Sequence, residues 1–460
     1  MTATLPTSTS ASEVARLRST FATGRTRDVA WRLAQLEGVE RMVAEREDDF
    51  AIALAADLGR PRVDAWLADL APTTAESAFA RKHLKRWMRS KRAGLPLSVQ
   101  PGSARYVYEP LGTVLIIGPW NYPVYLTLTP LVAALAAGNC AVVKPSEHAP
   151  AVAALLADLL PRYVDRDAVA VVTGGPEETQ DLLAQGLDHA FFTGSPEVGA
   201  LIMAAAAPTL TPVTLELGGK SPVIVTGDAD IAVAAKRIAW TKLMNSGQTC
   251  IAPDYVLVEE SVRDTLVAGI AEATRELRGG AEDGLRIVNA RQAARIAGLL
   301  DDHGGRIAYG GAVDVEALTG QPTIVVDPRP DSPLMTEEIF GPILPVLTVE
   351  DLDTAIRFVN DRPKPLAVYL FSRSKGVAKR VTAEISSGGT VINHLMFHVL
   401  VPQLPFGGVG RSGMGAYHGR WGFETFSHRK SVLTKPTRPD LSLIYPPYTA
   451  KAEKLLRRFF

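Results

Sequence analysis

The sequence predicts an α/β protein of two domains, the first of which contains a parallel, doubly wound sheet. The chain has 460 residues, which is more than one hydrophobic core usually supports. From residue 113 onward, short continuous apolar runs alternate with segments whose apolar residues recur at helical spacing. The same alternation starts again after residue 217, so we expect a second α/β domain there.

The N-terminal segment 13–93 is expected to be helical. Its apolar residues are interleaved with charges at roughly helical spacing, as in Leu36, Val39, Met42, Val43, Phe50 and Ile52. The following segment 99–110 contains a Pro-Gly-Ser turn signal between two short stretches that could pair as a hairpin. We expect this hairpin to form an arm, because two strands alone are marginal in water and need a partner.

The segment 113–194 supplies the strands and helices of the first sheet. An apolar run at 113–117, a helix-like stretch closed by Gly138-Asn139 and a second apolar run at 140–144 form one β-α-β unit. The pattern then repeats with a helix at 151–160, a strand at 168–172, a helix at 177–185 and a strand at 189–194.

The second domain follows the same pattern after residue 217. Apolar runs predict its strands at 255–258, 323–326, 343–347, 366–371 and 389–393, with helices at 261–277 and near 350–360. The last residues, KAEKLLRRFF, form a basic and aromatic tail. We expect this tail to be solvated or packed, because one short segment binds lipid weakly.

Composition favours small-molecule chemistry. Lys plus Arg and Asp plus Glu both number 49, so no global charge would attract nucleic acid or an anionic membrane. Only two cysteines occur, which excludes a disulfide framework and a Cys-rich zinc site and suits a reducing compartment. The first residues lack a basic and apolar leader, and no apolar run is long enough to cross a bilayer, so we expect a cytoplasmic protein.

Two segments could carry nucleophilic chemistry. Cys250, in NSGQTCIAP, is a plausible exposed nucleophile, although a free cysteine is more often a small buried hydrophobe. Cys140, within an apolar strand, fits the buried interpretation. Glu216 ends a strand-like run before Gly218-Gly219 and is either a general base or a solvated strand-end carboxylate. A thiol with a carboxylate base could form an acyl-enzyme and then hydrolyse it.

One turn could bind a phosphate, and no segment predicts a metal site. In FFTGSPEVG, Ser195 is placed to cap a helix that begins at Pro196, where free backbone N–H groups could hold a phosphate. A plain strand-to-helix turn explains this motif equally well. His394 and His398 are four residues apart without a nearby acidic ligand, so we expect no metal.

Seven motifs in order make the chain resemble the aldehyde dehydrogenases. They are PWNYP (119–123), KPSE (144–147), FTGSPEVG (192–199), ELGGKSP (216–222), NSGQTC (245–250), EEIFGPILPV (337–346) and PFGGVGRSGMG (405–415). Further stretches, including SSGGTVIN and YHGRWGFETFSHRKS, resemble the class 3 branch, which includes fatty and aromatic aldehyde dehydrogenases. The resemblance covers nearly the whole chain.

The resemblance implies catalytic roles for three residues. Cys250 would attack the aldehyde carbon to give a thiohemiacetal, whose oxyanion the Asn121 amide and the Cys250 backbone N–H would hold. Hydride transfer to a nicotinamide would leave a thioester, and Glu216 would activate the water that hydrolyses it to a carboxylate. Alternatives are a CoA-acylating dehydrogenase and a non-catalytic nicotinamide-binding protein.

The resemblance also implies a cofactor site, for NAD with NADP also accepted, and a substrate tunnel. Lys144 and Glu147 would contact the adenosine ribose, Ser195 the pyrophosphate and Glu338 the nicotinamide ribose. The remaining expected cofactor residues are Trp120, Gly194, Gly199, Leu217 and Phe340. An apolar substrate tunnel would be lined by Tyr122, Trp240 and Phe406.

By resemblance, the chain divides into a Rossmann-type cofactor domain, a catalytic domain and a small β arm for oligomerisation. The expected bounds are 1–93 and 110–216 for the NAD(P)-binding domain, 217–410 for the catalytic domain, 94–109 and 436–446 for the arm, and 447–460 for the tail. The expected assembly is a homodimer, and the partner of the enzyme is a small-molecule aldehyde.

Overall fold

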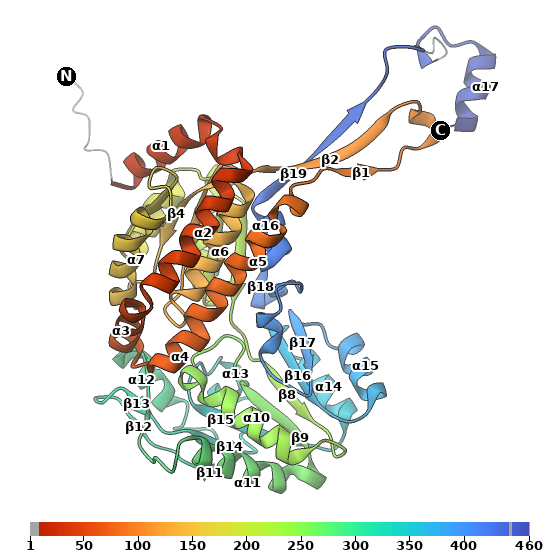
Figure 1. Cartoon of the computed structure of the whole chain (residues 1–460). Helices are drawn as coiled ribbons and strands as arrows, with labels where there is room; N and C mark the ends of the chain where they lie inside the picture. Colours follow the sequence, from red (N-terminus) through yellow and green to blue (C-terminus); the bar gives the residue numbers. More distant parts are fainter. Residues whose placement is uncertain (1–8, 441–443, 460) are drawn as a thin grey trace.

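The computed structural model describes residues 9–440 and 444–459 as two α/β lobes with a long arm (Figure 1). The upper lobe in this view holds most of the first half of the chain, and the lower lobe holds the segment from about residue 220 to 400. The arm projects from the upper lobe. This arrangement confirms the predicted α/β class.

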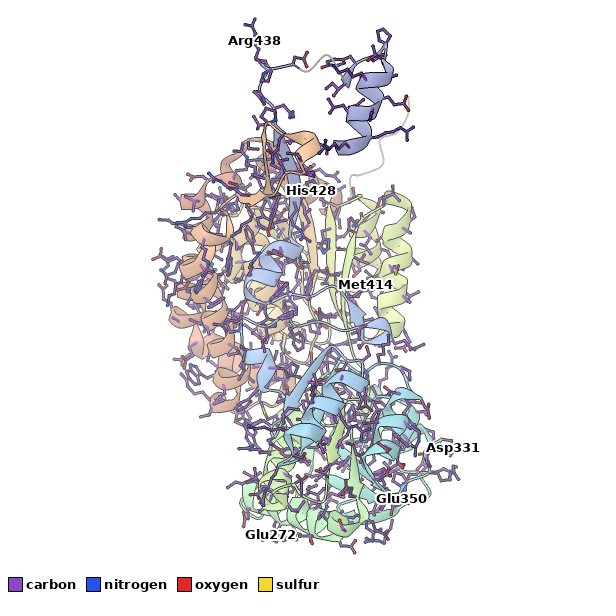
Figure 2. All side chains as sticks on the ribbon, turned by 90° about the vertical axis from the view of Figure 1, so that its right-hand side faces the viewer. Glu272, Asp331, Glu350, Met414, His428 and Arg438 are labelled. Carbon is purple, nitrogen blue, oxygen red and sulfur yellow. The ribbon has the colours of Figure 1, made fainter. Side chains whose placement is uncertain are left out.

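The first lobe is built on a six-stranded sheet. Its order is β18-β7-β6-β3-β4-β5, and the pairs among β7, β6, β3, β4 and β5 are parallel. The bounds are β3 Thr113–Ile117, β4 Cys140–Lys144, β5 Val169–Val171, β6 His189–Gly194, β7 Val213–Leu217 and β18 Gly413–Met414. The parallel strands confirm the sequence prediction. The antiparallel β18 returns from the far end of the chain, and its Met414 lies midway along the molecule in Figure 2.

Helices cover both faces of this sheet. Their bounds are α1 Thr9–Ala22, α2 Val29–Glu45, α3 Glu47–Leu58, α4 Arg62–Ala65, α5 Ala71–Trp87, α6 Tyr125–Ala137, α7 Pro150–Tyr163, α8 Pro176–Ala184, α9 Pro196–Ala206 and α16 Gly419–Thr425. Every residue of α6 is buried, because α2, α5 and α16 pack around it. Gly138 ends α6 in the left-handed conformation (φ 89°), as the Gly-Asn signal predicts.

The second lobe contains a seven-stranded sheet in the order β11-β14-β15-β9-β8-β16-β17. Only the edge pair β11–β14 is antiparallel. The bounds are β8 Pro222–Val225, β9 Tyr255–Glu259, β11 Arg306–Tyr309, β14 Thr323–Val326, β15 Ile343–Val349, β16 Ala367–Phe371 and β17 Gly389–Ile392. Its helices are α10 Ile231–Leu243, α11 Glu260–Leu277, α12 Ala290–Gly298, α13 Pro333–Thr336, α14 Leu352–Asn360 and α15 Lys375–Glu384. A small sheet of β10 Leu285–Arg286, β13 Thr319–Gly320 and β12 Val313–Asp314 lies beside it.

The arm differs from the predicted hairpin. Its central strand, β2 Ser103–Pro110, pairs antiparallel with β1 Lys91–Ala93 on one side and with β19 Ser427–Thr434 on the other. The prediction of two strands within 99–110 is therefore wrong, and the strand expected near 436–446 lies at Ser427–Thr434, while residues 441–443 fall outside the described residues. The polar pattern of β19 hides it from period-based prediction, because neither of its faces is buried.

The C-terminal helix α17 Ala450–Phe459 lies beside the tip of the arm (Figure 1). In Figure 2, Arg438 marks the end of the arm, far from Glu272 on the second lobe. Within the described residues, none of the helices has the length and apolar composition needed to cross a membrane.

Candidate active site

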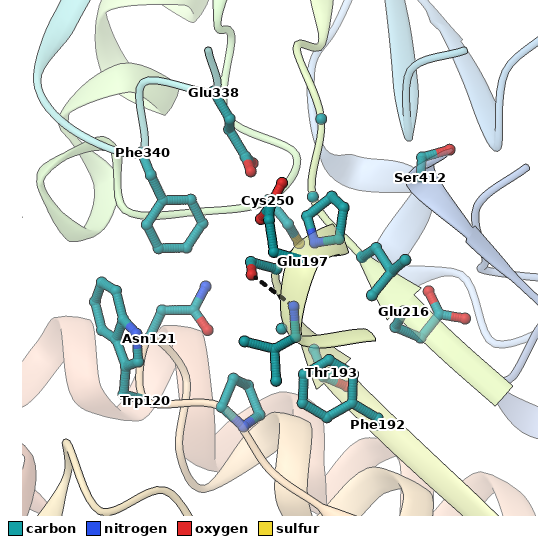
Figure 3. A pocket seen from close by; sticks show the side chains of 18 of the residues that line it. Trp120, Asn121, Phe192, Thr193, Glu197, Glu216, Cys250, Glu338, Phe340 and Ser412 are labelled. Carbon is teal, nitrogen blue, oxygen red and sulfur yellow. Dashed lines mark hydrogen bonds between the residues drawn. The ribbon is translucent and has the colours of Figure 1, made fainter. Parts of the chain in front are cut away.

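A cleft of about 890 Å³ lies between the two lobes, where the parallel strands β3, β6 and β7 end. Ligands of open α/β sheets bind at this position, because the crossover loops leave a crevice at the carboxyl ends of the strands. The cleft brings together 11 of the predicted site residues: Trp120, Asn121, Lys144, Glu147, Gly194, Ser195, Glu216, Leu217, Cys250, Glu338 and Phe340. Figure 3 shows its inner end, around Cys250.

Cys250 follows a strained segment at the end of α10. Asn245 and Ser246 both have positive φ angles, 49° and 58°, which are unusual for residues other than glycine. Burial, with the Glu338 and Glu216 carboxylates nearby, raises the pKa of the Cys250 thiol to about 12. The resting cysteine is therefore a neutral thiol that must lose its proton before it can act as a nucleophile.

Asn121 lies in the loop between β3 and α6, buried beside residues 244–250, which carry Cys250 and are called the cysteine loop below. Its Nδ2 donates a hydrogen bond of 3.1 Å to the Gln248 carbonyl oxygen, two residues before Cys250. In Figure 3 the amide points into the space in front of Cys250. The second N–H of this amide can therefore donate to an oxygen that develops negative charge on a carbon attacked by the thiol.

Glu216 is fully buried near the end of β7. Neither of its carboxyl oxygens has a hydrogen-bond partner among the described residues, and burial raises its pKa well above the usual range. Figure 3 shows its side chain turned away from Cys250, and a Cβ on Gly407 would come within 3.1 Å of Oε1. Glu216 is thus held as a neutral acid whose carboxyl group points away from the thiol.

Glu338, Phe340 and Trp120 form the wall opposite. Burial raises the pKa of Glu338 to about 8, and the Asp254 carboxylate adds to this effect. Its Oε1 has no partner among the described residues, so it can accept a hydrogen bond from a ligand. A Cβ on Gly218 would come within 2.0 Å of the Glu338 carboxylate, so only glycine allows this approach. The Phe340 ring packs edge-on to Trp120, with ring centroids 5.2 Å apart.

Lys144 and Glu147 lie at the other end of the cleft, after β4. The buried Lys144 Nζ donates to Glu147 Oε2 at 3.1 Å. Burial alone would raise the pKa of Glu147, but its own backbone N–H and the Lys144 ammonium outweigh burial and lower it. An ionised carboxylate and an ammonium group side by side can bind the hydroxyl groups of a ribose.

The first turn of α9 opens onto the middle of the cleft. Ser195 caps this helix by accepting a hydrogen bond from Val198 N, and Pro196 is its first residue, as predicted. Gly199 does not line the cleft. A Cβ there would come within 2.7 Å of Leu217 Cδ2, so glycine lets α9 pack closely on the end of β7. A helix N-terminus here suits a phosphate.

The expected tunnel residues lie outside this cleft. Tyr122 hydroxyl contacts Thr249 Oγ1 at 2.6 Å, next to Cys250, and its ring is buried. Trp240 contacts the rings of His394 and Phe397. Phe406 is buried against Tyr417 and two histidine rings. Their role as a substrate tunnel stays a prediction.

No group of three or more His, Cys, Asp or Glu side chains with the arrangement of a metal site occurs among residues 9–440 and 444–459. His394 stacks on the Phe397 ring at 3.9 Å. Burial lowers the pKa of His398 to about 4, so this ring is neutral.

The model of the "Aldehyde dehydrogenase family" matches residues 6–432 of the chain. The chain belongs to the aldehyde dehydrogenase family. It is 48% identical over 441 residues to aldehyde dehydrogenase family 3 member A2 of Rattus norvegicus, covering 95% of this chain and 91% of that protein. It is 46% identical to the aldehyde dehydrogenase of the same organism described as dimeric and NADP-preferring, covering 95% of this chain and 98% of that protein.

The fold of this aldehyde dehydrogenase matches solved relatives closely. The substrate-bound state of Staphylococcus aureus AldH superposes with a TM-score of 0.93 at 42% identity, covering 98% of this chain and 99% of that one. The chain is therefore an NAD(P)-dependent enzyme that oxidises aldehydes. The unpartnered Glu338 oxygen, the α9 N-terminus and the Lys144–Glu147 pair fit a dinucleotide along the cleft.

Sequence reasoning missed several residues of this aldehyde dehydrogenase that support the site. Arg60 and Asp69 form a buried ion pair behind Asn121, and Asn245 joins them to the cysteine loop. The available signals were a charged Asp69 within the apolar stretch WLADLA and an arginine directly after a helix-ending glycine. Neither signal shows that Arg60 and Asp69 contact the loops that carry Asn121 and Cys250.

Proposed function

We propose that Cys250 is the nucleophile of this aldehyde oxidation, and that Asn121 with the Cys250 backbone N–H forms the oxyanion hole. The observation that carries this proposal is that the thiol and the Asn121 amide meet in one cleft (Figure 3). Attack by the thiolate sulfur on the aldehyde carbon forms a C–S bond, and the carbonyl electron pair moves to the oxygen. The two N–H donors stabilise the resulting alkoxide.

A bound NAD or NADP would supply the acceptor for the hydride that leaves the thiohemiacetal carbon. Lys144, Glu147, Ser195 and Glu338 would hold this cofactor, with Gly194, Leu217, Trp120 and Phe340 shaping the cleft around it. Glu216, once it has lost its own proton and turned toward the thioester, would take a proton from water, whose oxygen attacks the Cys250 thioester and releases a carboxylate and the thiol. Both cofactors would be used, because Lys144 neutralises Glu147 and so limits repulsion of an extra phosphate.

The assembly is proposed to be a homodimer formed through the arm. The rat relative is described as dimeric. Large apolar side chains lie exposed along the arm and beyond it, including Leu97, Leu433 and Tyr448. Both cysteines are free, which suits the reducing cytoplasm, where we place the enzyme.

Paired cysteine variants test the nucleophile. Cys250→Ser should abolish aldehyde oxidation and leave NAD binding intact, because a serine hydroxyl without a strong base is a far weaker nucleophile than a thiolate. Cys140→Ser is the matched control, since this thiol is buried within β4 and should be dispensable. Oxidation of an aldehyde is followed by the absorbance of the reduced nicotinamide. Comparable turnover in wild type and Cys250→Ser would refute the assignment.

A further inference from the structure

A buried ion pair lies directly behind the catalytic loops, and the proposed chemistry assigns it no role. Arg60 follows the C-terminal Gly59 of α3, and Asp69 lies in the π-helical segment Trp66–Leu70. The side chains of Arg60 and Asp69 are 4% and 0% exposed, and the guanidinium donates to Asp69 Oδ2. A buried ion pair rarely adds net stability, because the cost of desolvating both charges offsets their attraction. The role of Arg60 and Asp69 must therefore be sought in the groups that they hold in place.

Asp69 fixes the start of α6. Its Oδ1 accepts hydrogen bonds from Val124 N at 3.1 Å and from Tyr125 N at 2.8 Å, the first backbone groups of the helix. Val124, at the N-cap position of α6, supplies no capping side chain of its own. A carboxylate at a helix N-terminus binds free N–H groups and opposes the positive end of the helix dipole. Asp69 therefore holds the loop that carries Asn121 at its helical end.

Arg60 joins this loop to the cysteine loop. One guanidinium nitrogen, NH2, donates to the Asn121 carbonyl oxygen at 2.7 Å and to Asn245 Oδ1 at 2.7 Å. The Asn245 Nδ2 in turn donates to the carbonyl oxygens of Asn121 and Gln248, both at 3.0 Å. The Asn121 amide donates to the same Gln248 oxygen. Four of these five hydrogen bonds connect Asn121, which carries one oxyanion donor, to the loop that carries the other, two of them through Arg60.

The planar guanidinium also lies over the Tyr122 ring, 4.8 Å from its centroid. This stacking and the fork of N–H groups require arginine, because a lysine ammonium is a single donor centre with no flat face. The Tyr122 hydroxyl reaches Thr249, so the stacked ring provides a second link to the residue before Cys250.

We propose that Arg60, supported by Asp69, is a positioning residue that sets the Asn121 amide at the correct distance from Cys250 and so completes the oxyanion hole. The proposal rests on the function assigned to Cys250 and Asn121. Arg60 does not line the cleft. Its effect is confined to steps in which a carbonyl oxygen becomes an oxyanion.

The experiment compares Arg60→Lys with Arg32→Lys, both made on a Cys140→Ser background so that Cys250 is the single thiol. Arg32 is an equally buried arginine that donates to Thr26 and Ala136 carbonyl oxygens, away from the catalytic loops. Arg60→Lys should lower kcat for aldehyde oxidation by about 10- to 100-fold, because a small misplacement of a catalytic group has an effect of that size. Arg32→Lys should leave kcat unchanged, and neither variant should change the KM for NAD.

A reaction without an oxyanion separates positioning from general damage. Alkylation of Cys250 by iodoacetamide is a displacement at a saturated carbon, so it needs the thiolate but not the Asn121 amide. Arg60→Lys should therefore leave the alkylation rate unchanged while it slows hydrolysis of p-nitrophenyl acetate, an ester that requires the oxyanion hole and no cofactor. Equal loss in alkylation and ester hydrolysis would overturn the proposal.

A double-mutant cycle with Asn121→Ala tests the route of the effect. When Asn121 is already absent, Arg60→Lys should slow ester hydrolysis by less than about threefold, because residues that act through one another are not additive. Additive losses would overturn the proposal. Asn245→Gly provides a second variant that keeps the left-handed backbone and removes the side-chain bonds to both loops, and it should slow ester hydrolysis in the same non-additive way. Absence of aldehyde oxidation in wild type would instead refute the proposed function, and the ester cycle would still decide the role of Arg60.

Discussion

Three acidic side chains at the inner end of the cleft, Cys250, Glu338 and Glu216, have pKa values raised by burial. The pKa of Cys250 rises to about 12, that of Glu338 to about 8, and that of Glu216 well above its usual range. Charged forms are disfavoured here because the cleft wall replaces water without supplying enough hydrogen bonds. Three neighbouring anions would also repel one another. In the free enzyme, the proposed nucleophile Cys250 and the proposed base Glu216 are therefore both protonated.

The reactivity of Cys250 should follow this raised pKa. Because the pKa lies far above neutrality, the thiolate fraction in the free enzyme should grow about tenfold per pH unit from about pH 7 to pH 10. The rate of iodoacetamide alkylation in the Cys140→Ser variant should rise with the same slope. A plateau near pH 8 would show that the thiol of the free enzyme is far more acidic than its burial implies.

Glu216→Gln should separate the two halves of the reaction. The amide keeps the size of the side chain but cannot take a proton from water, so the thioester should accumulate. Rapid mixing with aldehyde and NAD should give one burst of reduced nicotinamide followed by slow turnover. Loss of the burst together with turnover would show that Glu216 also deprotonates Cys250.

At the scale of elements, the termini of α6 and α9 bring the chemistry to the cleft. Both helices begin just after a strand of the first sheet, so their N-terminal N–H groups point toward its carboxyl edge. Asp69, which belongs to another helical segment, accepts hydrogen bonds from the first N–H groups of α6 and so holds the preceding loop next to Cys250. The start of α9 is capped locally by Ser195 and faces the cleft. The first terminus therefore shapes the catalytic loop, and the second is free for the cofactor.

Ser195→Ala should weaken cofactor binding as well as stability. Ser374→Ala is the matched control, because Ser374 caps α15 through an equal bond of 3.3 Å, away from the cleft. Each variant should lose about 1 kcal/mol of unfolding free energy with the cap. Only Ser195→Ala should also raise the KM for NAD, by about fivefold if one neutral hydrogen bond is lost. Equal KM values in the two variants would show that Ser195 is a helix cap alone.

At the scale of the whole molecule, the arm is the part whose strands have few packing partners within one chain. A three-stranded sheet whose strands β2 and β19 contain a single fully buried residue, Pro110, has little core of its own, so we expect it to pair with a second copy. Light scattering should give a mass near twice 49.3 kDa. Deleting residues 99–106, which include the first half of β2, should yield monomer or aggregate. A stable and active monomer from either preparation would rule out the arm as the dimer contact.

The sequence by itself determined the elements that have local signals. Strands such as β3 and β4 appear as continuous apolar runs because they are buried on both faces, and α6 ends where Gly138-Asn139 indicates. Ser195 and Pro196 marked the start of α9 because capping is a local interaction. The catalytic assignments came from seven motifs in a fixed order. Together these motifs identify the family far more specifically than any single motif does.

Tertiary structure decided everything that depends on long-range pairing. Strands β2 and β19, whose paired residues Tyr106 and Ser431 are distant in the chain, form the arm, and no local pattern sets this register. The sequence shows neither that the buried Glu216 side chain turns away from Cys250 nor that Arg60 bridges Asn121 and Asn245. Burial and charge at these points come from residues far away in the chain, so their protonation and geometry exist only once the fold has brought those residues together.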